Sequence, residues 1–156
     1  MFGSRTELGL DFHVEQDPGL LCVDIFLGGL HVNARDNAFY PPLLVKKLKD
    51  ELHRFRTPTV PPPGFEAAFE AGQDFARYEF LEWGECTDDV LAFAFTEGDQ
   101  VHLACRVHDE QEAHVPTTVS MSRASLVETL EQGLVVAERE WSARLAAMNR
   151  ARAAEA

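Results

Sequence analysis

Apolar and polar residues alternate over the first 40 positions, which is the pattern of half-buried strands. Leu8 to Val14 alternates up to an Asp17-Pro18-Gly19 turn, and Leu21 to Leu27 forms a second apolar row. Gly28-Gly29 separates that row from a third alternation over Leu30 to Ala34, and a Gly-Gly step between two such runs predicts a hairpin. The sequence therefore predicts strands within about residues 7–38.

The spacing becomes helical after Pro41-Pro42, where leucines and a phenylalanine recur every three to four residues up to Phe55 with charged residues between them. This pattern predicts an amphipathic helix over about residues 42–55. The Pro-rich stretch 57–64 cannot continue a helix and favours an extended backbone, so we expect a stiff crossover within one domain.

Further strand candidates follow closely between about residues 65 and 121. The Glu97-Gly98-Asp99 step is the clearest hairpin, because both flanks alternate and the glycine can take positive φ. The first candidate also suits a short helix, since it is rich in Ala and Glu. The five candidates are Phe65 to Ala71, Phe75 to Trp83, Val90 to Phe95, Val101 to Val107 and Val115 to Met121.

A long C-terminal helix is predicted over about residues 125–150. Ser125 and Glu128 have the spacing of a capping box, and a continuous apolar stripe follows, with the tail beyond Arg150 expected to fray. Strands followed by a helix, without regular βαβ alternation, predict an α+β fold. We therefore expect one domain over 1–156: a largely antiparallel sheet of about seven or eight strands packed by two helices, the longer at the C-terminus.

Net charge narrows the classes of partner. The 156 residues carry 14 Lys and Arg against 26 Asp and Glu, giving a net charge of -12. This balance argues against binding to nucleic acid or to anionic membranes. No apolar run approaches the roughly 20 residues that a membrane helix needs, and three cysteines without a C-x-x-C pair suit reduced thiols. These features predict a soluble cytoplasmic protein.

Most of that charge lies in residues 61–115, which hold 2 bases and 13 acids, a net -11. Acids beside aromatic residues predict a partner-binding surface for a basic protein, because the acids steer the partner and the rings supply contact area. The alternative is a solvated turn above core aromatics. The candidate partner-binding residues are Tyr78, Glu79, Glu82, Trp83, Glu85, Asp88 and Asp89.

The residues do not indicate a metal site, a cofactor site or a catalytic site. His102-x-x-Cys105-x-x-His108, with His114 further on, has ligand types suited to zinc, but alternation in a strand turns Cys105 away from both histidines. We therefore predict no metal, and we assign no cofactor and no catalytic residue, because no known catalytic or phosphate-binding motif is present.

Two alternatives to a partner-binding surface stay open. A small-molecule-binding domain or an enzyme could use a cavity between the sheet and the C-terminal helix, for which Phe12, Phe93, Phe95 and Trp141 are candidate lining residues. Ordinary core packing is the competing interpretation of these rings. A homodimer could form through the C-terminal apolar stripe or through an open sheet edge.

The order of early hairpins, a basic helix, a meander with Tyr78-Glu79-Phe80-Leu81-Glu82-Trp83 and a closing helix after Met121-Ser122 resembles the WapI-type immunity proteins of bacterial toxin systems. The resemblance covers most of the chain and rests on layout and acidic character. It implies a small cytoplasmic antitoxin that neutralises a toxin by tight binding, without catalysis. The Pro-rich crossover departs from that layout, and no functional residue is carried over.

Overall fold

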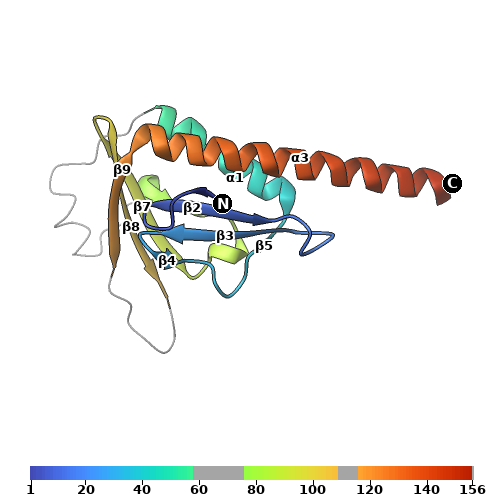
Figure 1. The fold of residues 1–156 in the computed structure, drawn as a ribbon, viewed down its shortest axis with the longest axis horizontal. Helices are drawn as coiled ribbons and strands as arrows, with labels where there is room; N and C mark the ends of the chain where they lie inside the picture. Colours follow the sequence, from blue (N-terminus) through green and yellow to red (C-terminus); the bar gives the residue numbers. More distant parts are fainter. Residues whose placement is uncertain (58–75, 109–115, 156) are drawn as a thin grey trace.

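The computed structural model describes residues 1–57, 76–108 and 116–155, which form two antiparallel sheets and two helices (Figure 1). The predicted α+β class and the longer C-terminal helix are confirmed. The predicted single sheet is wrong, because the described residues contain nine strands in two sheets. The helices are α1 (Pro41–Arg56) and α3 (Arg123–Glu155), with short 3-10 turns η1 (Ala76–Tyr78) and η2 (Glu85–Thr87).

The first sheet contains β1 (Phe2–Gly3), β2 (Leu8–His13), β3 (Leu21–Leu27), β4 (Leu30–His31) and β5 (Ala38–Phe39). Its strand order is β1-β2-β3-β4, and β5 also pairs with β3. The Gly28-Gly29 hairpin is confirmed, and both glycines have the positive φ that such a tight turn requires. Because β2 occupies one edge of β3 while β4 and β5 share the other, the later strands start a new sheet.

The third alternating run was predicted over Leu30 to Ala34, but the strand β4 ends at His31. Beyond it, the side chain of Asn33 makes the hydrogen bonds to β3 that a longer strand would make. After β4, the Asn33 amide accepts a hydrogen bond from the Ile25 N–H and donates one to the Val23 carbonyl, both at 2.8 Å. Asn33 is only 3% exposed, so these bonds satisfy buried backbone groups on β3 that a longer β4 would have paired.

The second sheet has the order β6-β7-β8-β9 and is built from consecutive antiparallel neighbours. Its strands are β6 (Glu79–Phe80), β7 (Val90–Glu97), β8 (Gln100–Val107) and β9 (Thr117–Ser122). The predicted β7–β8 hairpin is confirmed, with Gly98 at φ 58°. The predicted strand from Phe75 to Trp83 is wrong over its described part, where only β6 is extended. The candidate at 65–71 and most of the Pro-rich crossover lie outside the described residues.

Helix α3 begins at Arg123, two residues before the predicted start, and continues past Arg150 to Glu155. The cap is provided by Ser122, whose Oγ accepts a hydrogen bond from the Ser125 N–H at 3.0 Å. Ser125 therefore lies in the first turn and not at the cap, since β9 leads directly into the helix. Alanines are frequent after residue 142, and their high helix propensity explains why the last turns stay helical.

The two sheets and both helices share one hydrophobic core. The inward rows of β2 and β3 contribute Leu8, Leu10 and Ile25, all fully buried, and α1 contributes Leu44 and Leu48. Helix α3 lies against β1, β2, β8 and β9 and also packs against α1 (Figure 1). In the described part of the chain, no helix is both long and apolar enough to span a membrane.

Candidate functional site

The candidate partner-binding residues fall into two groups according to their burial. Glu82, Glu85, Asp88 and Asp89 are exposed, and they lie on the segment 82–89, which we call the acidic turn. Tyr78 and Trp83, at 1% and 0% exposed, belong to the core. Glu79 is half-buried in β6. The aromatic rings therefore cannot supply contact area to a partner, and the surface consists of the carboxylates alone.

The buried residues have a different role, because they fix the backbone that carries the acids. The Trp83 N–H donates to the Leu81 carbonyl at 2.9 Å, and the Thr87 hydroxyl bonds the Gly84 carbonyl at 3.0 Å. Gly84 has φ 109°, and a Cβ there would come within 2.8 Å of the Leu43 side chain on α1. Segment 81–87 is therefore a tightly bonded unit packed on α1.

A buried ion pair on α1 contacts the two strands that flank this segment, β6 and β7. Arg54 Nη1 lies 3.5 Å from the Glu51 carboxylate and also donates to the Glu79 carbonyl, while Nη2 donates to the Ala94 carbonyl at 2.8 Å. Glu51 is 8% exposed. Arg54 thereby connects α1 to the second sheet, because its guanidinium donates to one carbonyl on β6 and to one on β7.

Burial raises the pKa of the Glu51 carboxyl to about 7, and Arg54 opposes this shift without cancelling it. The Trp83 indole and the Leu81 backbone amide also favour the ionised form. Leu81 has φ 64°, which is an unfavourable conformation for a leucine.

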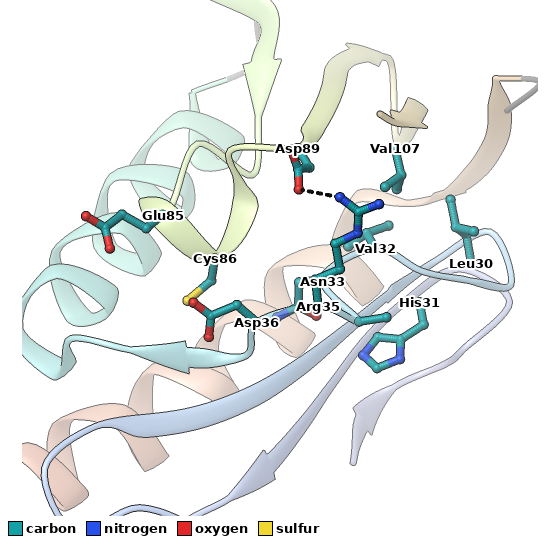
Figure 2. Close-up of a pocket in the computed structure, with 11 residues that line it drawn as sticks. Leu30, His31, Val32, Asn33, Arg35, Asp36, Glu85, Cys86, Asp89 and Val107 are labelled. Atoms are coloured by element: carbon teal, nitrogen blue, oxygen red, sulfur yellow. Dashed lines mark ion pairs between the residues drawn. The ribbon is translucent and has the colours of Figure 1, made fainter. Parts of the chain in front are cut away.

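A hollow of about 280 Å³ lies next to the acidic turn, between the loop after β4 and η2 (Figure 2). Arg35 points across it to Asp89, with Nη1 and Oδ2 3.5 Å apart. On the floor, the Cys86 sulfur lies beside the Asp36 carboxylate. Burial and the Asp36 charge raise the pKa of the Cys86 thiol to about 12, so this cysteine is a poor nucleophile at neutral pH.

Basic residues near the acidic turn neutralise it only in part. Arg35 pairs with Asp89, and Lys47 lines a second small hollow together with Glu82 and Asp88. Within residues 1–57, 76–108 and 116–155, no cationic group lies within 4 Å of the Glu85 carboxylate. The surface therefore retains a net negative charge and an exposed acid to receive a basic group.

A second polar cluster, on the outer face of the first sheet, was missed by the sequence reasoning. The Asp24 carboxylate bonds His13 Nε2 at 2.9 Å and Asn37 Nδ2 at 2.8 Å, and His31 Nε2 lies 3.2 Å from it. Burial alone would raise the pKa of Asp24, but these partners outweigh it and the pKa is lowered. The sequence does contain a signal for this cluster, because Asp24 lies between two inward-facing residues of β3 and its side chain must therefore point outward.

The alternation predicted for β8 is observed. Cys105 is 1% exposed and faces the core, where burial raises the pKa of its thiol to about 12, whereas His102 bonds the Ser120 hydroxyl at 2.7 Å on the outer side. His114 lies outside the described residues. Among those described, no group of three His, Cys, Asp or Glu side chains has an arrangement suited to a metal ion.

The four rings proposed to line a cavity have separate surroundings. Phe12 lies against Gly133 of α3, and Phe95 lies over the His102 ring at 5.1 Å. Trp141 meets Tyr40 edge to face at 6.4 Å, and Phe93 is 6% exposed within the second sheet. Their contacts are those of packed and surface rings, and they do not mark a shared ligand site.

Comparisons of the chain with protein-family models, with curated proteins and with solved structures found no match. Of the predicted surface, the structure brings Glu82, Glu85, Asp88 and Asp89 together on the acidic turn and places Tyr78 and Trp83 beneath them.

Proposed function

We propose that the chain is a non-enzymatic protein-binding domain whose acidic turn, residues 82–89, receives a basic protein. The observation that supports this most directly is the combination of four exposed carboxylates with a backbone held by buried anchors. A rigid acidic surface loses little conformational entropy on binding and accelerates association with a basic partner. The likeness in layout to the WapI-type immunity proteins makes a bacterial toxin one candidate for that partner.

The chemistry of the other polar groups is consistent with binding without catalysis. The Cys86 and Cys105 thiols are protonated at neutral pH because their pKa values are raised to about 12. Glu51, the carboxyl with a pKa near 7, is buried under Trp83 and out of reach of a substrate. A partner that supplies Lys or Arg side chains could instead bind the acidic turn directly, in competition with Arg35 and Lys47.

The test is affinity capture from the native cells with three forms of the tagged protein, at moderate salt. The first is the wild type. In the second, Glu82, Glu85 and Asp88 are all changed to Arg, and in the matched control the same change is made at the exposed residues Glu15, Asp99 and Glu128. A basic protein retained by the wild type and the control, but lost by the acidic-turn variant, supports the proposal. Equal retention by all three forms contradicts it.

Binding of a captured partner should weaken steeply as salt increases, because exposed charges separated by more than about 10 Å are screened at 0.1 M. Unfolding curves of the three forms provide the check on folding. Surface reversals away from buried networks change stability by only about 0.5 kcal/mol, so all three midpoints should agree closely. Loss of the partner together with loss of the fold would be an effect on stability, and single reversals would then replace the triple variant.

A further inference from the structure

The second sheet ends at β9, which lies at the end of the molecule opposite the C-terminus (Figure 1). Strand β9 pairs with β8 on one side, and no strand in the described part of the chain pairs with its other side. The strands at the other sheet edges, β1, β4, β5 and β6, have only two residues each, whereas β9 has six. Among the described residues, β9 is therefore the longest edge strand.

Strand β9 also lacks the features by which edge strands avoid association, which are charged side chains, prolines and bulges within the strand. Its sequence, Thr-Thr-Val-Ser-Met-Ser, contains no charge and no proline. Its register with β8 runs without interruption from Thr117 opposite Cys105 to Ser122 opposite Gln100, so the strand has no bulge. An uncharged and regular edge of this length is suited to pairing with another strand.

The backbone groups on the free edge of β9 follow from the hydrogen bonds on its paired edge. The Arg123 N–H donates to the Asp99 carbonyl at 2.8 Å, one step beyond the end of the β8–β9 ladder. Because the bonding direction alternates along an antiparallel strand, the odd-numbered residues of β9 bond to β8, and the backbone groups of Thr118, Ser120 and Ser122 point outward. The carbonyl of Ser122 is an exception, since Ser122 is the cap of α3 and its carbonyl accepts the first bond of the helix.

We infer that β9 pairs antiparallel with β9 of a second copy, about a two-fold axis through Val119, so that the two four-stranded sheets become one continuous sheet. In this register Thr118 lies opposite Ser120 of the second copy, and the two residues exchange both of their backbone hydrogen bonds. Ser122 lies opposite Pro116, which is exposed, directly precedes β9 and has a carbonyl but no N–H. The Ser122 N–H donates to that carbonyl, and the missing Pro116 N–H matches the Ser122 carbonyl that α3 already uses. Every outward backbone group of this edge is then paired.

The side chains match in the same register. A two-fold axis through a residue keeps the inner faces of both sheets on one side, so Val119 meets Val119 of the second copy, and Thr117 meets Met121. Val119 is only partly buried against the core of its own chain, and this contact covers it further. Pairing β9 with itself brings no like charges together, because the strand has none. These matches favour a second copy over an unrelated strand as the occupant of the edge.

Sedimentation equilibrium of the full chain from about 10 µM to about 1 mM tests the pairing, and we expect a reversible monomer–dimer equilibrium. Two double variants test the register, because the exposed Thr118 faces the exposed Ser120 of the second copy. Thr118→Lys with Ser120→Lys should weaken the dimer about tenfold through two like-charge pairs, whereas Thr118→Lys with Ser120→Glu makes these pairs attractive and should dimerise at least as well as the wild type. Gln132→Lys with Ser142→Lys, both exposed on α3, controls for the change in net charge and should leave the dimer intact. A wild type that stays monomeric throughout overturns the inference, and so does equal weakening by the two edge variants.

Cross-linking locates the axis without adding charge. Val119→Cys brings the thiols of two copies to the axis, where the Cα atoms of such a non-hydrogen-bonded pair lie about 4.5 Å apart, so mild oxidation should give a covalent dimer. Thr118→Cys is the matched control, because it is more exposed, yet its two copies lie on opposite sides of the axis and beyond the roughly 7 Å that a disulfide can span. The three native cysteines are buried and do not compete. Cross-linking of Thr118→Cys as strong as that of Val119→Cys would exclude this register. These changes leave the acidic turn unaltered, so its proposed function stands or fails separately.

Discussion

The buried carboxyl of Glu51 makes a quantitative prediction about stability and pH. Burial raises its folded-state pKa from the ordinary value of 4.5 to about 7. Between these two values the folded state holds a proton that the unfolded state has lost, so stability decreases as pH rises through this window. The difference of about 2.5 pH units, at 1.36 kcal/mol per unit, corresponds to about 3 kcal/mol.

Glu51→Gln should remove this dependence, because the amide keeps the shape of the side chain and does not titrate. We expect the stability of the wild type relative to the variant to fall by about 3 kcal/mol from about pH 4.5 to about pH 7, and to level off above that. Groups that titrate equally in both proteins cancel in this difference. Asp24 is present in both proteins, and because its pKa is lowered, its titration changes their stability equally and at pH values below this window.

The measurement is denaturant unfolding of both proteins at half-unit steps of pH, with midpoints and slopes fitted to a two-state transition. Glu128→Gln serves as the control, since Glu128 is exposed on α3 and its loss should leave the curve unchanged. A difference that stays constant across the window would mean that burial does not raise the pKa of Glu51, which contradicts the prediction. If attraction to Arg54 outweighed burial, the wild type would gain stability relative to the variant as pH rises toward about 4.5, below the window.

Three further predictions concern backbone and surface contacts. Gly28→Ala should destabilise the protein by more than Gly29→Ala, by about 1 kcal/mol or more in thermal unfolding, because both have positive φ but only a Cβ at position 28 would collide with Thr117, at 2.5 Å. Arg144→Ala should cost about 1–3 kcal/mol in chemical unfolding, since its guanidinium satisfies three carbonyls of the 14–20 loop. Asp24→Asn should flatten the loss of stability at acid pH, measured by denaturant unfolding, because the lowered pKa of Asp24 stabilises the fold only above its titration range.

The regular elements could be predicted because their local signals agree with their packing. Residues 90–107 alternate on both sides of Gly98, and the structure gives a β7–β8 hairpin with Glu97 opposite Gln100. The helix over 41–56 likewise follows from its spacing of leucines. One face of each of these elements packs against the core, so the spacing of the apolar residues is enough to predict whether the element is a strand or a helix.

The division into two sheets could not be predicted, because it depends on which strand edges are already paired. Nothing in the local pattern shows that Ala38–Phe39 returns to pair with Leu21–Cys22. Nor does it show that the Asn33 side chain completes β3 where a strand was predicted. Both contacts join residues distant in sequence, and each closes an edge that the later strands would otherwise extend.

The segment that leads into the acidic turn shows how alternation fails where the backbone leaves the strand region. From Phe80 to Trp83 three of the four side chains are buried, including the consecutive Phe80 and Leu81. A strand would turn successive side chains to opposite faces, but Leu81 at φ 64° rotates the chain so that both enter the core. Acidic and aromatic residues that lie next to one another in the sequence are therefore divided between the surface, which holds the acids, and the core, which holds the rings. Charge counting located the exposed carboxylates, since burying several like charges is costly, whereas the position of the rings required the backbone conformation at Leu81.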